Sequence, residues 1–453
     1  MPASRPLAAA LALLLVVAAP ARAAGVPPFT IVDLREGDGD SYAFYEDKFT
    51  VGSDGWAYFA AEDATSGREL WRAKQGSSDM VVQRVANIAP GSDSSYPECL
   101  AAVGDWVYFK ADDGTHGAEL WRTDGTEAGT AMVKDIYGAG SGSYPYGFVA
   151  LGSSVYFAAD DGTNGIEVWR SDGSEAGTTM VKNISAAGTA APQDFIVFDG
   201  AVYFTADDDT HARELWRTDG TEAGTTMVKN ISASGTSYPL DFAVVGDYLY
   251  FRASDDDHHE ELWRTDGTEA GTTMVKDIQL GTGGSYPGQL TAFGGTLYFS
   301  ADDGTNGVEL WKSDGTAGGT QMVQGINPGT DSAYPYSLVP LGDYLYFGAY
   351  DAANGYYYPY RTDGTSIERV PFPADPAEYL NCECDLMVAA GATLFSIAYS
   401  DAIGNEFAYL TEPTAELPPT NGSGSPWTLP LALLAALTAA AGVAFRRAGV
   451  AQP

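Results

Sequence analysis

One sixteen-residue segment, ELWRTDGTEAGTTMVK, occurs twice without a change, at residues 214–229 and again at residues 261–276. Related segments recur along the chain, and one aromatic position in them repeats every 47 to 50 residues. The residues at this position are Trp71, Trp121, Trp169, Trp216, Trp263, Trp311 and Tyr360. A period of this size is typical of a repeat architecture and lies near the periods of known propeller blades.

Each repeat contains four short apolar segments. In residues 246–293 they read YLYFRA, ELWRT, TMVKDI and LTAF, and turn-forming Gly, Asp, Thr, Ser and Pro separate them. No segment of the repeats has sustained helical spacing. Short connections favour antiparallel neighbours. The pattern therefore predicts an all-β fold, a β-propeller of four-stranded antiparallel blades made of these four strands in this order. A β-helix fits less well, because its coils are shorter.

The number of blades follows from the ends of the repeat region. Seven full units span about residues 53–390, residues 29–52 match the second half of a unit, and residues 391–411 match the first half. The two halves are expected to pair and form an eighth blade, which would close the ring and hide its edge strands. Seven blades is the alternative.

The repeat resembles that of bacterial surface proteins known for their ELWxxDGT motif. The motif is intact at residues 119–126, 214–221, 261–268 and 309–316, and altered to EVWRSDGS from Glu167. The first and seventh units depart from it, with ELWRAKQG and YPYRTDGT. The resemblance covers about residues 50–390. It implies an exported, propeller-like protein and no settled activity.

Both ends of the chain carry targeting patterns. Residues 1–24 have the charged, apolar and small-residue order of a secretory signal peptide. Residues 427–445 hold no charge and are long enough for a transmembrane helix, and Arg446 and Arg447 follow directly. The positive-inside rule then places residues 446–453 in the cytoplasm. The expected organisation is a propeller at residues 25–412 outside a single-pass membrane anchor, at the cell surface or in the cell envelope.

Residues 413–426 form a Pro-, Gly- and Ser-rich linker with a candidate sorting motif. Its Leu417, Pro418, Pro419 and Thr420 resemble an LPxT signal, which implies a sortase-like processing enzyme as a partner. Asn421 stands where such signals usually have Gly. A plain linker is the alternative.

The charge of the chain restricts its partners. All 60 acidic residues, and all basic residues except Arg5, Arg22, Arg446 and Arg447, lie between the two ends. Such an acidic domain is not suited to nucleic acid or to an anionic membrane surface. Its three cysteines, Cys99, Cys382 and Cys384, allow one bridge and leave one over.

Paired carboxylates recur in the first turn of several repeats, as in ADDGTHG and ADDGTNG. Hard oxygen ligands of this kind suit Ca²⁺. The candidate calcium ligands are Asp112, Asp113, Asp160, Asp161, Asp207, Asp208, Asp302 and Asp303. The alternative is a structural Asp-Gly turn. Histidine and asparagine alternate at one position of this turn, which favours a turn role over metal ligation for His116.

Other candidate residues are aromatic or charged. Tyr356, Tyr357 and Tyr358 break the repeat pattern and form a candidate patch for contact with sugar or protein. The tyrosines of the recurring SYP and AYP segments are expected in blade packing or loops. In ELWR the Glu and the Arg point to opposite faces of a strand, so ion pairs are expected between adjacent blades.

No catalytic motif such as G-x-S-x-G or H-E-x-x-H occurs in the chain. Acids that recur in every blade indicate architecture, and no pair of carboxylates stands out as a glycoside-hydrolase pair. The sequence therefore predicts a non-enzymatic, surface-anchored module for binding, adhesion or recognition, with an extracellular glycan or protein as its partner. The alternatives are an extracellular hydrolase with a site on the top face of the propeller, and a structural surface protein without a ligand.

Overall fold

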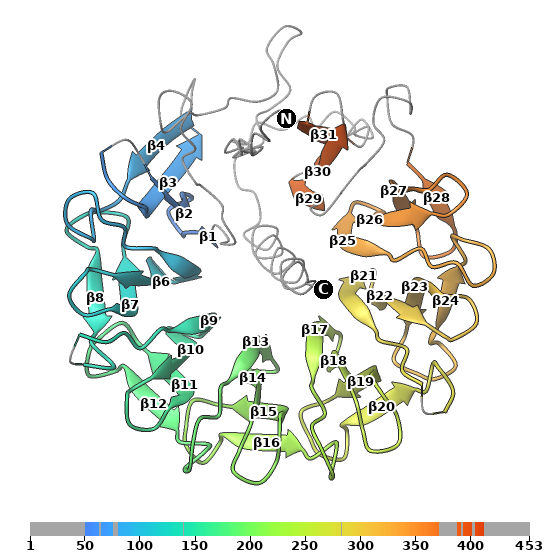
Figure 1. The fold of residues 1–453 in the computed structure, drawn as a ribbon, viewed down its shortest axis with the longest axis horizontal. Helices are drawn as coiled ribbons and strands as arrows, with labels where there is room; N and C mark the ends of the chain where they lie inside the picture. The colour runs from blue at the N-terminus through green and yellow to red at the C-terminus, as the bar shows by residue number, and fades with distance from the viewer. Residues whose placement is uncertain are drawn as a thin grey trace, which may run out of the picture. The chain divides into compact units, whose positions relative to one another are not determined.

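The computed structural model describes residues 50–370, apart from 63–64, 76–79, 139 and 282, and three strands between residues 387 and 411. The described residues form strands and turns, and seven four-stranded antiparallel sheets follow one another along the chain as the blades of a β-propeller. Figure 1 labels the strands in chain order. The chain divides after Ala191 into two compact units.

The first unit holds three blades. Their strands are β1 (Thr50–Val51), β2 (Ala57–Ala61), β3 (Glu69–Gln75) and β4 (Met80–Arg84), then β5 (Glu98–Val103), β6 (Trp106–Asp112), β7 (Ala118–Thr123) and β8 (Ala131–Lys134), then β9 (Tyr146–Leu151), β10 (Ser154–Asp160), β11 (Ile166–Ser171) and β12 (Thr179–Lys182).

The second unit holds four blades and a three-stranded sheet. The first two blades are formed by β13 (Gln193–Phe198), β14 (Ala201–Ala206), β15 (Glu214–Thr218) and β16 (Thr226–Lys229), and by β17 (Leu240–Val245), β18 (Tyr248–Ala253), β19 (Glu261–Thr265) and β20 (Thr273–Lys276). The next two are formed by β21 (Gly288–Phe293), β22 (Thr296–Asp302), β23 (Val308–Ser313) and β24 (Gln321–Gln324), and by β25 (Tyr336–Leu341), β26 (Tyr344–Asp351), β27 (Tyr356–Thr362) and β28 (Ile367–Arg369). The last sheet contains β29 (Met387–Ala390), β30 (Thr393–Ser400) and β31 (Gly404–Thr411).

The blade fold is confirmed, but the predicted grouping of strands was wrong by one. The segment LTAF was expected as the last strand of its repeat, after TMVKDI. It is instead β21, the first strand of the next blade, and Phe293 pairs with Thr296 of β22 across a two-residue turn. Gly294 and Gly295 both have positive φ, at 57° and 75°, which suits this tight hairpin. The longer segment between β20 and β21 is a crossover from one blade to the next.

The prediction of an eighth blade has two parts, the existence of an eighth sheet and the pairing of residues 29–52 with residues 391–411. An eighth sheet exists among the described residues, with the order β29-β30-β31. Thr50 and Val51 pair with Tyr58 and Ala57 of their own blade, so for these two residues the expected pairing with residues 391–411 was wrong. Residues 29–49 lie outside the described part of the chain, and their pairing stays a prediction.

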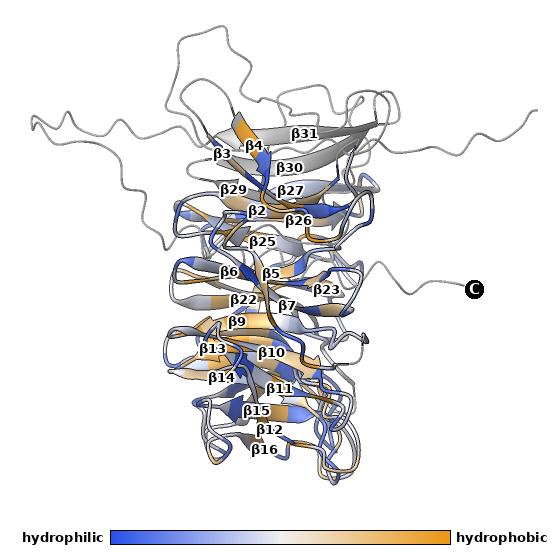
Figure 2. Ribbon diagram, turned by 90° about the vertical axis from the view of Figure 1, so that its left-hand side faces the viewer, coloured by the Kyte–Doolittle hydropathy of each residue, from blue (hydrophilic) through white to orange (hydrophobic). Residues whose placement is uncertain are grey.

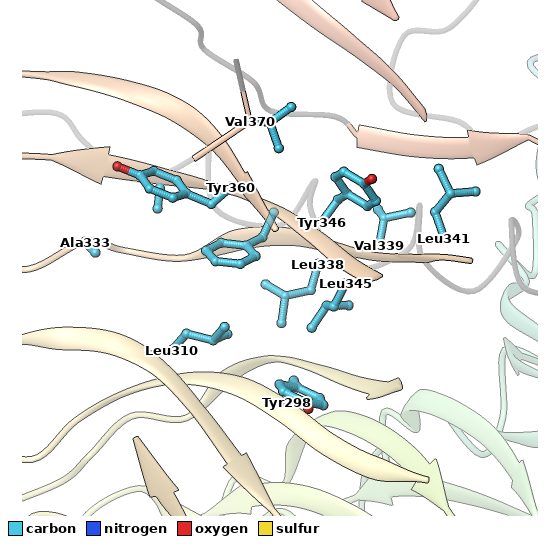
Figure 3. Packing of buried hydrophobic residues seen from close by; sticks show 12 residues of the cluster. Tyr298, Leu310, Ala333, Leu338, Val339, Leu341, Leu345, Tyr346, Tyr360 and Val370 are labelled. Atoms are coloured by element: carbon cyan, nitrogen blue, oxygen red, sulfur yellow. The ribbon is translucent and has the colours of Figure 1, made fainter. Parts of the chain in front are cut away.

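Alternation along the strands packs adjacent blades against each other. In β18, Leu249 and Phe251 contact the blade β13–β16, whereas Tyr250, on the opposite face, packs with Leu297 of the blade β21–β24. Figure 2 shows hydrophobic residues concentrated in strands such as β9 and β10 and hydrophilic residues in the turns. Figure 3 shows the equivalent cluster around Tyr346 and Leu338. The core is therefore a series of interfaces between blades.

The turns of each blade emerge on two sides. The hairpins that join the first strand to the second and the third to the fourth, such as residues 294–295 and 314–320, define the hairpin side. The crossovers between blades and the turns between second and third strands, such as residues 277–287 and 303–307, define the crossover side. Antiparallel strand order places these two groups of turns at opposite ends of the blade.

The glycine of several DGT turns is a contact point between adjacent blades on the hairpin side. Gly267 has a φ of 89°, and a Cβ there would collide with the Tyr203 hydroxyl of the preceding blade. Gly315 has the same relation to Tyr250, and Gly173 in the first unit to Tyr108. The motif is thus constrained by backbone conformation and by a neighbouring side chain together.

We expect Gly267→Ala to lower the free energy of unfolding by about 2 kcal/mol or more, because the side chain needs both a strained φ and a displaced tyrosine. Gly318→Ala is the matched control, since Gly318 has open space around it and no positive φ. Urea denaturation of both variants measures the difference. Equal stability of the two would contradict this account of the motif.

Several sequence predictions concern residues outside the described part of the chain. These are the signal peptide at 1–24, the linker at 413–426, the membrane segment at 427–445, and Cys382 and Cys384. Within the residues that are described, no helix is long and apolar enough to cross a membrane.

Candidate functional site

A buried carboxylate holds the crossover in place in the blades that keep the glutamate of ELW. Glu261, at the start of β19, is fully buried, and its carboxylate accepts hydrogen bonds from the Ile278 and Ser285 N–H groups at 3.0 Å each. The Ser285 hydroxyl donates a further bond of 2.6 Å, and the Gln279 N–H one of 3.3 Å. These donors lie at both ends of the crossover that follows β20. The glutamate of ELW therefore fastens this segment to its blade.

The same arrangement recurs in the other blades, and the expected Glu–Arg ion pairs between blades were wrong. Glu69, Glu119 and Glu214 also accept backbone N–H and serine hydroxyl donors from their crossovers. The cations contact carbonyl groups of the next blade instead. Arg217 Nη1 donates to Gly267 O at 3.1 Å, and Lys312 Nζ to Gly364 O at 2.7 Å. The spacing of Glu and Arg in ELWR indicated on which face of the strand each side chain lies, but it did not indicate which group each side chain bonds.

Burial acts against the charge of these carboxylates. It raises the pKa of Glu261, although the hydrogen bonds from Ser285 and the backbone lower it in part. Glu309 has Ala333 where Glu261 has Ser285, and the Ile326 and Asn327 N–H groups are its donors. Burial raises the pKa of Glu309 to about 7, from an ordinary 4.5. One blade thus has a more weakly stabilised carboxylate than its neighbour.

Because Ala333 offers Glu309 no hydroxyl donor, the stability of the folded chain is expected to depend on pH. Between about pH 4.5 and pH 7 the folded chain holds a proton on Glu309 that the unfolded chain lacks. The contribution of Glu309 to stability therefore falls as the pH rises through this window and is constant above it. The size of the fall is on the order of 3 kcal/mol. In Ala333→Ser the new hydroxyl lowers the folded pKa, and the fall should shrink.

Urea denaturation at about pH 5 and about pH 8 measures this fall, compared between the natural chain and the variant. Ser285→Ala is the matched control, because it removes the hydroxyl from Glu261 and should enlarge the fall. An identical pH dependence in Ala333→Ser and the natural chain would contradict the assignment.

The crossovers present tyrosines to solvent. Tyr238, Tyr286 and Tyr334 lie on successive crossovers of the second unit and are 52–54% exposed. Tyr96 and Tyr144 have the same position in the first unit. Within the described residues, their side chains make no hydrogen bond or ring contact. The sequence predicted that these tyrosines lie either in the packing between blades or in loops. The structure places them in loops, with exposed rings.

These tyrosines have an unfavourable backbone conformation. Their φ angles lie between 44° and 47°, in the left-handed region, and each precedes a proline, which further restricts its backbone. A residue with a Cβ pays about 1 kcal/mol or more for this conformation, and glycine would avoid the cost. Ala191 has the equivalent position in the blade β9–β12, with a φ of 42°. An exposed aromatic ring on a strained backbone is unexplained by packing.

The predicted calcium ligands act as turn formers. Asp113 Oδ1 accepts from the Thr115 and His116 N–H groups at 2.8 and 2.9 Å, and Asp112 Oδ1 accepts from Gly114 N at 2.7 Å. The same bonds recur at Asp160, Asp161, Asp302 and Asp303. Asp208 makes them with Thr210 and His211, and Asp207 pairs with Arg213 at 2.9 Å. Among the described residues, no group of three His, Cys, Asp or Glu side chains could hold a metal ion.

Histidine and asparagine are interchangeable in this turn because both donate to the same carboxylate. His116 Nδ1 lies 2.8 Å from Asp113 Oδ2, and Asn164 Nδ2 donates to Asp161 Oδ2 at 2.7 Å. The hydrogen bond to Asp113 raises the pKa of His116. This supports the turn role over metal ligation.

Calcium binding at the turns stays a prediction of the sequence, and thermal unfolding tests it. If calcium binds, the melting temperature should rise with millimolar Ca²⁺, because the ion binds the folded state. The double variant Asp112→Asn with Asp113→Asn should reduce this rise. A melting curve that is the same with Ca²⁺ and with chelator would leave these residues as turn formers alone.

The predicted patch at Tyr356, Tyr357 and Tyr358 lies in β27, and all three residues are partly buried. Tyr357 packs edge-on against Tyr336, with ring centroids 5.6 Å apart, and Arg369 stacks over Tyr358 at 3.3 Å. The crossover tyrosines offer more exposed aromatic surface. The predicted sorting motif at Leu417, Pro418, Pro419 and Thr420 lies outside the described residues.

Comparison with known proteins bears on the fold. No family model matches the sequence, and no curated protein matches it. Among solved structures, a puromycin hydrolase has a TM-score of 0.42 at 16% identity, over 71% of this chain and 52% of that one. A prolyl endopeptidase has a TM-score of 0.45 at 13% identity, over 78% and 54%. The β-propeller domain of the Trilobed protease from Pyrococcus furiosus has a TM-score of 0.38 at 11% identity, over 74% and 99%. This chain thus spans about half the length of the first two proteins.

Proposed function

We propose that this chain is an exported, surface-anchored β-propeller that binds a neutral extracellular glycan through the tyrosines of its crossovers. The observation that carries the proposal is the exposure of Tyr238, Tyr286 and Tyr334 on a strained backbone. A tyrosine ring offers an apolar face and a polar hydroxyl, which suit contact with a sugar ring. Export through residues 1–24 and anchoring through residues 427–445 belong to the proposal and rest on the sequence.

A polymeric ligand is favoured by the repetition of the site. Successive blades present the same residue in the same conformation, so each could contact an equivalent unit of a repetitive chain, and the contacts would reinforce one another. A globular protein offers no such repetition. The excess of acidic residues disfavours polyanionic polymers. A neutral polysaccharide fits both conditions.

An extracellular hydrolase is the alternative proposal. The hydroxyl–carboxylate pairs that recur in the blades, such as Ser285 with Glu261, are buried and fasten crossovers. Such an activity would therefore need residues other than these pairs, and cleavage of a bound glycan would reveal it.

The proposal predicts that replacing Tyr238, Tyr286 and Tyr334 by Ala weakens glycan binding about a hundredfold, at about 1 kcal/mol for each ring. The fold should persist, because Ala191 already occupies this position in another blade. A glycan array identifies the ligand, and calorimetry compares the two proteins. Unchanged affinity in the triple variant, or an array without any bound glycan, would contradict the proposal.

A further inference from the structure

A groove opens on the hairpin side of the second unit, between the blades β21–β24 and β25–β28. Its volume is about 500 Å³. Phe293, Thr296 and Tyr298 line it from one blade, and Asp343, Asp363 and Thr365 from the hairpins of the next. The groove lies on the side opposite the crossover tyrosines, so a ligand bound in it would be independent of a glycan bound at those tyrosines.

The blade β21–β24 lacks, at the groove, a stacked pair that other blades have. In the blade β17–β20 the guanidinium of Arg264 lies over the Tyr248 ring, 4.3 Å from its centroid. Arg122 and Trp106 form the same pair at 3.9 Å, and Arg361 and Tyr344 at 4.1 Å. The equivalent residues of the blade β21–β24 are Thr296 and Lys312.

The replacement of arginine by lysine also changes the hydrogen bonds. Lys312 Nζ donates to Gly364 O at 2.7 Å. The blade β13–β16 has Ala201 in place of the aromatic residue, but it keeps Arg217, which reaches the next blade at Gly267 O. The blade β21–β24 thus combines the loss of the aromatic residue with the loss of the guanidinium.

The Tyr298 hydroxyl faces the groove beside the position that arginine has in other blades. Tyr298 is 4% exposed, and its ring packs in the cluster with Leu345 (Figure 3). Its hydroxyl lies against Gly364. In the blade β17–β20, Arg264 Nη1 and the Tyr250 hydroxyl lie together against Gly315 at this place. Among the described residues, nothing bonds the Tyr298 hydroxyl. The Tyr298 hydroxyl thus faces the groove, where a ligand can hydrogen-bond it.

The groove carries negative charge beside this hydroxyl. Asp363 Oδ1 accepts from Thr365 N and Oγ1 and from Ser366 N, and these hydrogen bonds hold the pKa of Asp363 at about 2. Its Oδ2 takes no hydrogen bond within the described residues. Asp343 is exposed on the facing hairpin. Lys312 Nζ is engaged at Gly364 O, and the two carboxylates of the groove lining give it negative charge.

We propose that this groove binds a polyhydroxylated primary amine of the amino-sugar class. The ammonium group would pair with Asp343 and Asp363, a sugar hydroxyl would bond Tyr298, and the sugar ring would lie on Phe293. The charge of the carboxylates selects the amine over a neutral sugar of the same shape, and the Tyr298 hydroxyl selects a ligand with hydroxyl groups over a plain alkylamine.

Isothermal calorimetry with the full-length protein in a mild detergent tests the proposal. The probe is glucosamine at about pH 6, where its amine is protonated. Glucose and N-acetylglucosamine are the uncharged controls and should bind at least tenfold more weakly. Asp363→Asn should weaken glucosamine binding about tenfold, and Tyr298→Phe several-fold. Tyr250→Phe, in the neighbouring blade, should leave it unchanged.

A variant that fills the groove keeps the test independent of folding defects. Thr296→Tyr combined with Lys312→Arg restores the stacked pair of the blade β17–β20, so it should fold as well as the natural chain and lose glucosamine binding. Equal affinity for glucosamine and glucose would overturn the proposal. So would the absence of binding at millimolar glucosamine, or full binding by the filled variant.

Discussion

The fold depends on a carboxylate buried where a charge is costly. An ionised glutamate in an apolar interior is tolerated when donors surround it, because removing water from a charge costs several kcal/mol. In this chain the donors come from the crossover that leads to the next blade, as the Ile278 and Ser285 N–H groups do for Glu261. The same hydrogen bonds therefore stabilise the charge of Glu261 and fix the path of the chain between two sheets.

That path also positions the exposed tyrosines. Tyr286 follows Ser285 directly, so the segment fastened by Glu261 is the segment that presents the ring. A serine at this position strengthens the attachment, and Ala333 weakens it at Glu309. The framework of the propeller and its candidate binding face are thus linked through a few hydrogen bonds on each crossover, while the hairpin side is shaped separately by glycine, tyrosine and arginine contacts.

The blade architecture could be predicted from the sequence because the repeat period and the alternation of apolar residues are local signals. The assignment of LTAF to its blade was wrong because two connections flank it, and the Gly294–Gly295 turn is the tighter one. Sequence spacing placed Glu261 and Arg264 on opposite faces of the strand. The partners of Glu261 come from a crossover, and backbone N–H donors cannot be recognised in a sequence because every residue except proline has one. The exposure of Tyr286 depends on a positive φ, which a tyrosine does not indicate. The changes at Thr296 and Lys312 are visible in the aligned repeats. The groove beside them could not be predicted, because residues of two adjacent blades line it.

The most direct test of the central claim is hydrogen–deuterium exchange of Glu261→Gln. The substitution keeps the shape of the side chain and replaces one acceptor oxygen by a donor, which conflicts with the N–H groups that face it. Peptides that span residues 277–286 should lose about tenfold or more in protection, while peptides that span the equivalent crossover at residues 135–144 keep theirs. Unchanged protection of residues 277–286 would contradict the claim that the buried glutamate holds the crossover in place.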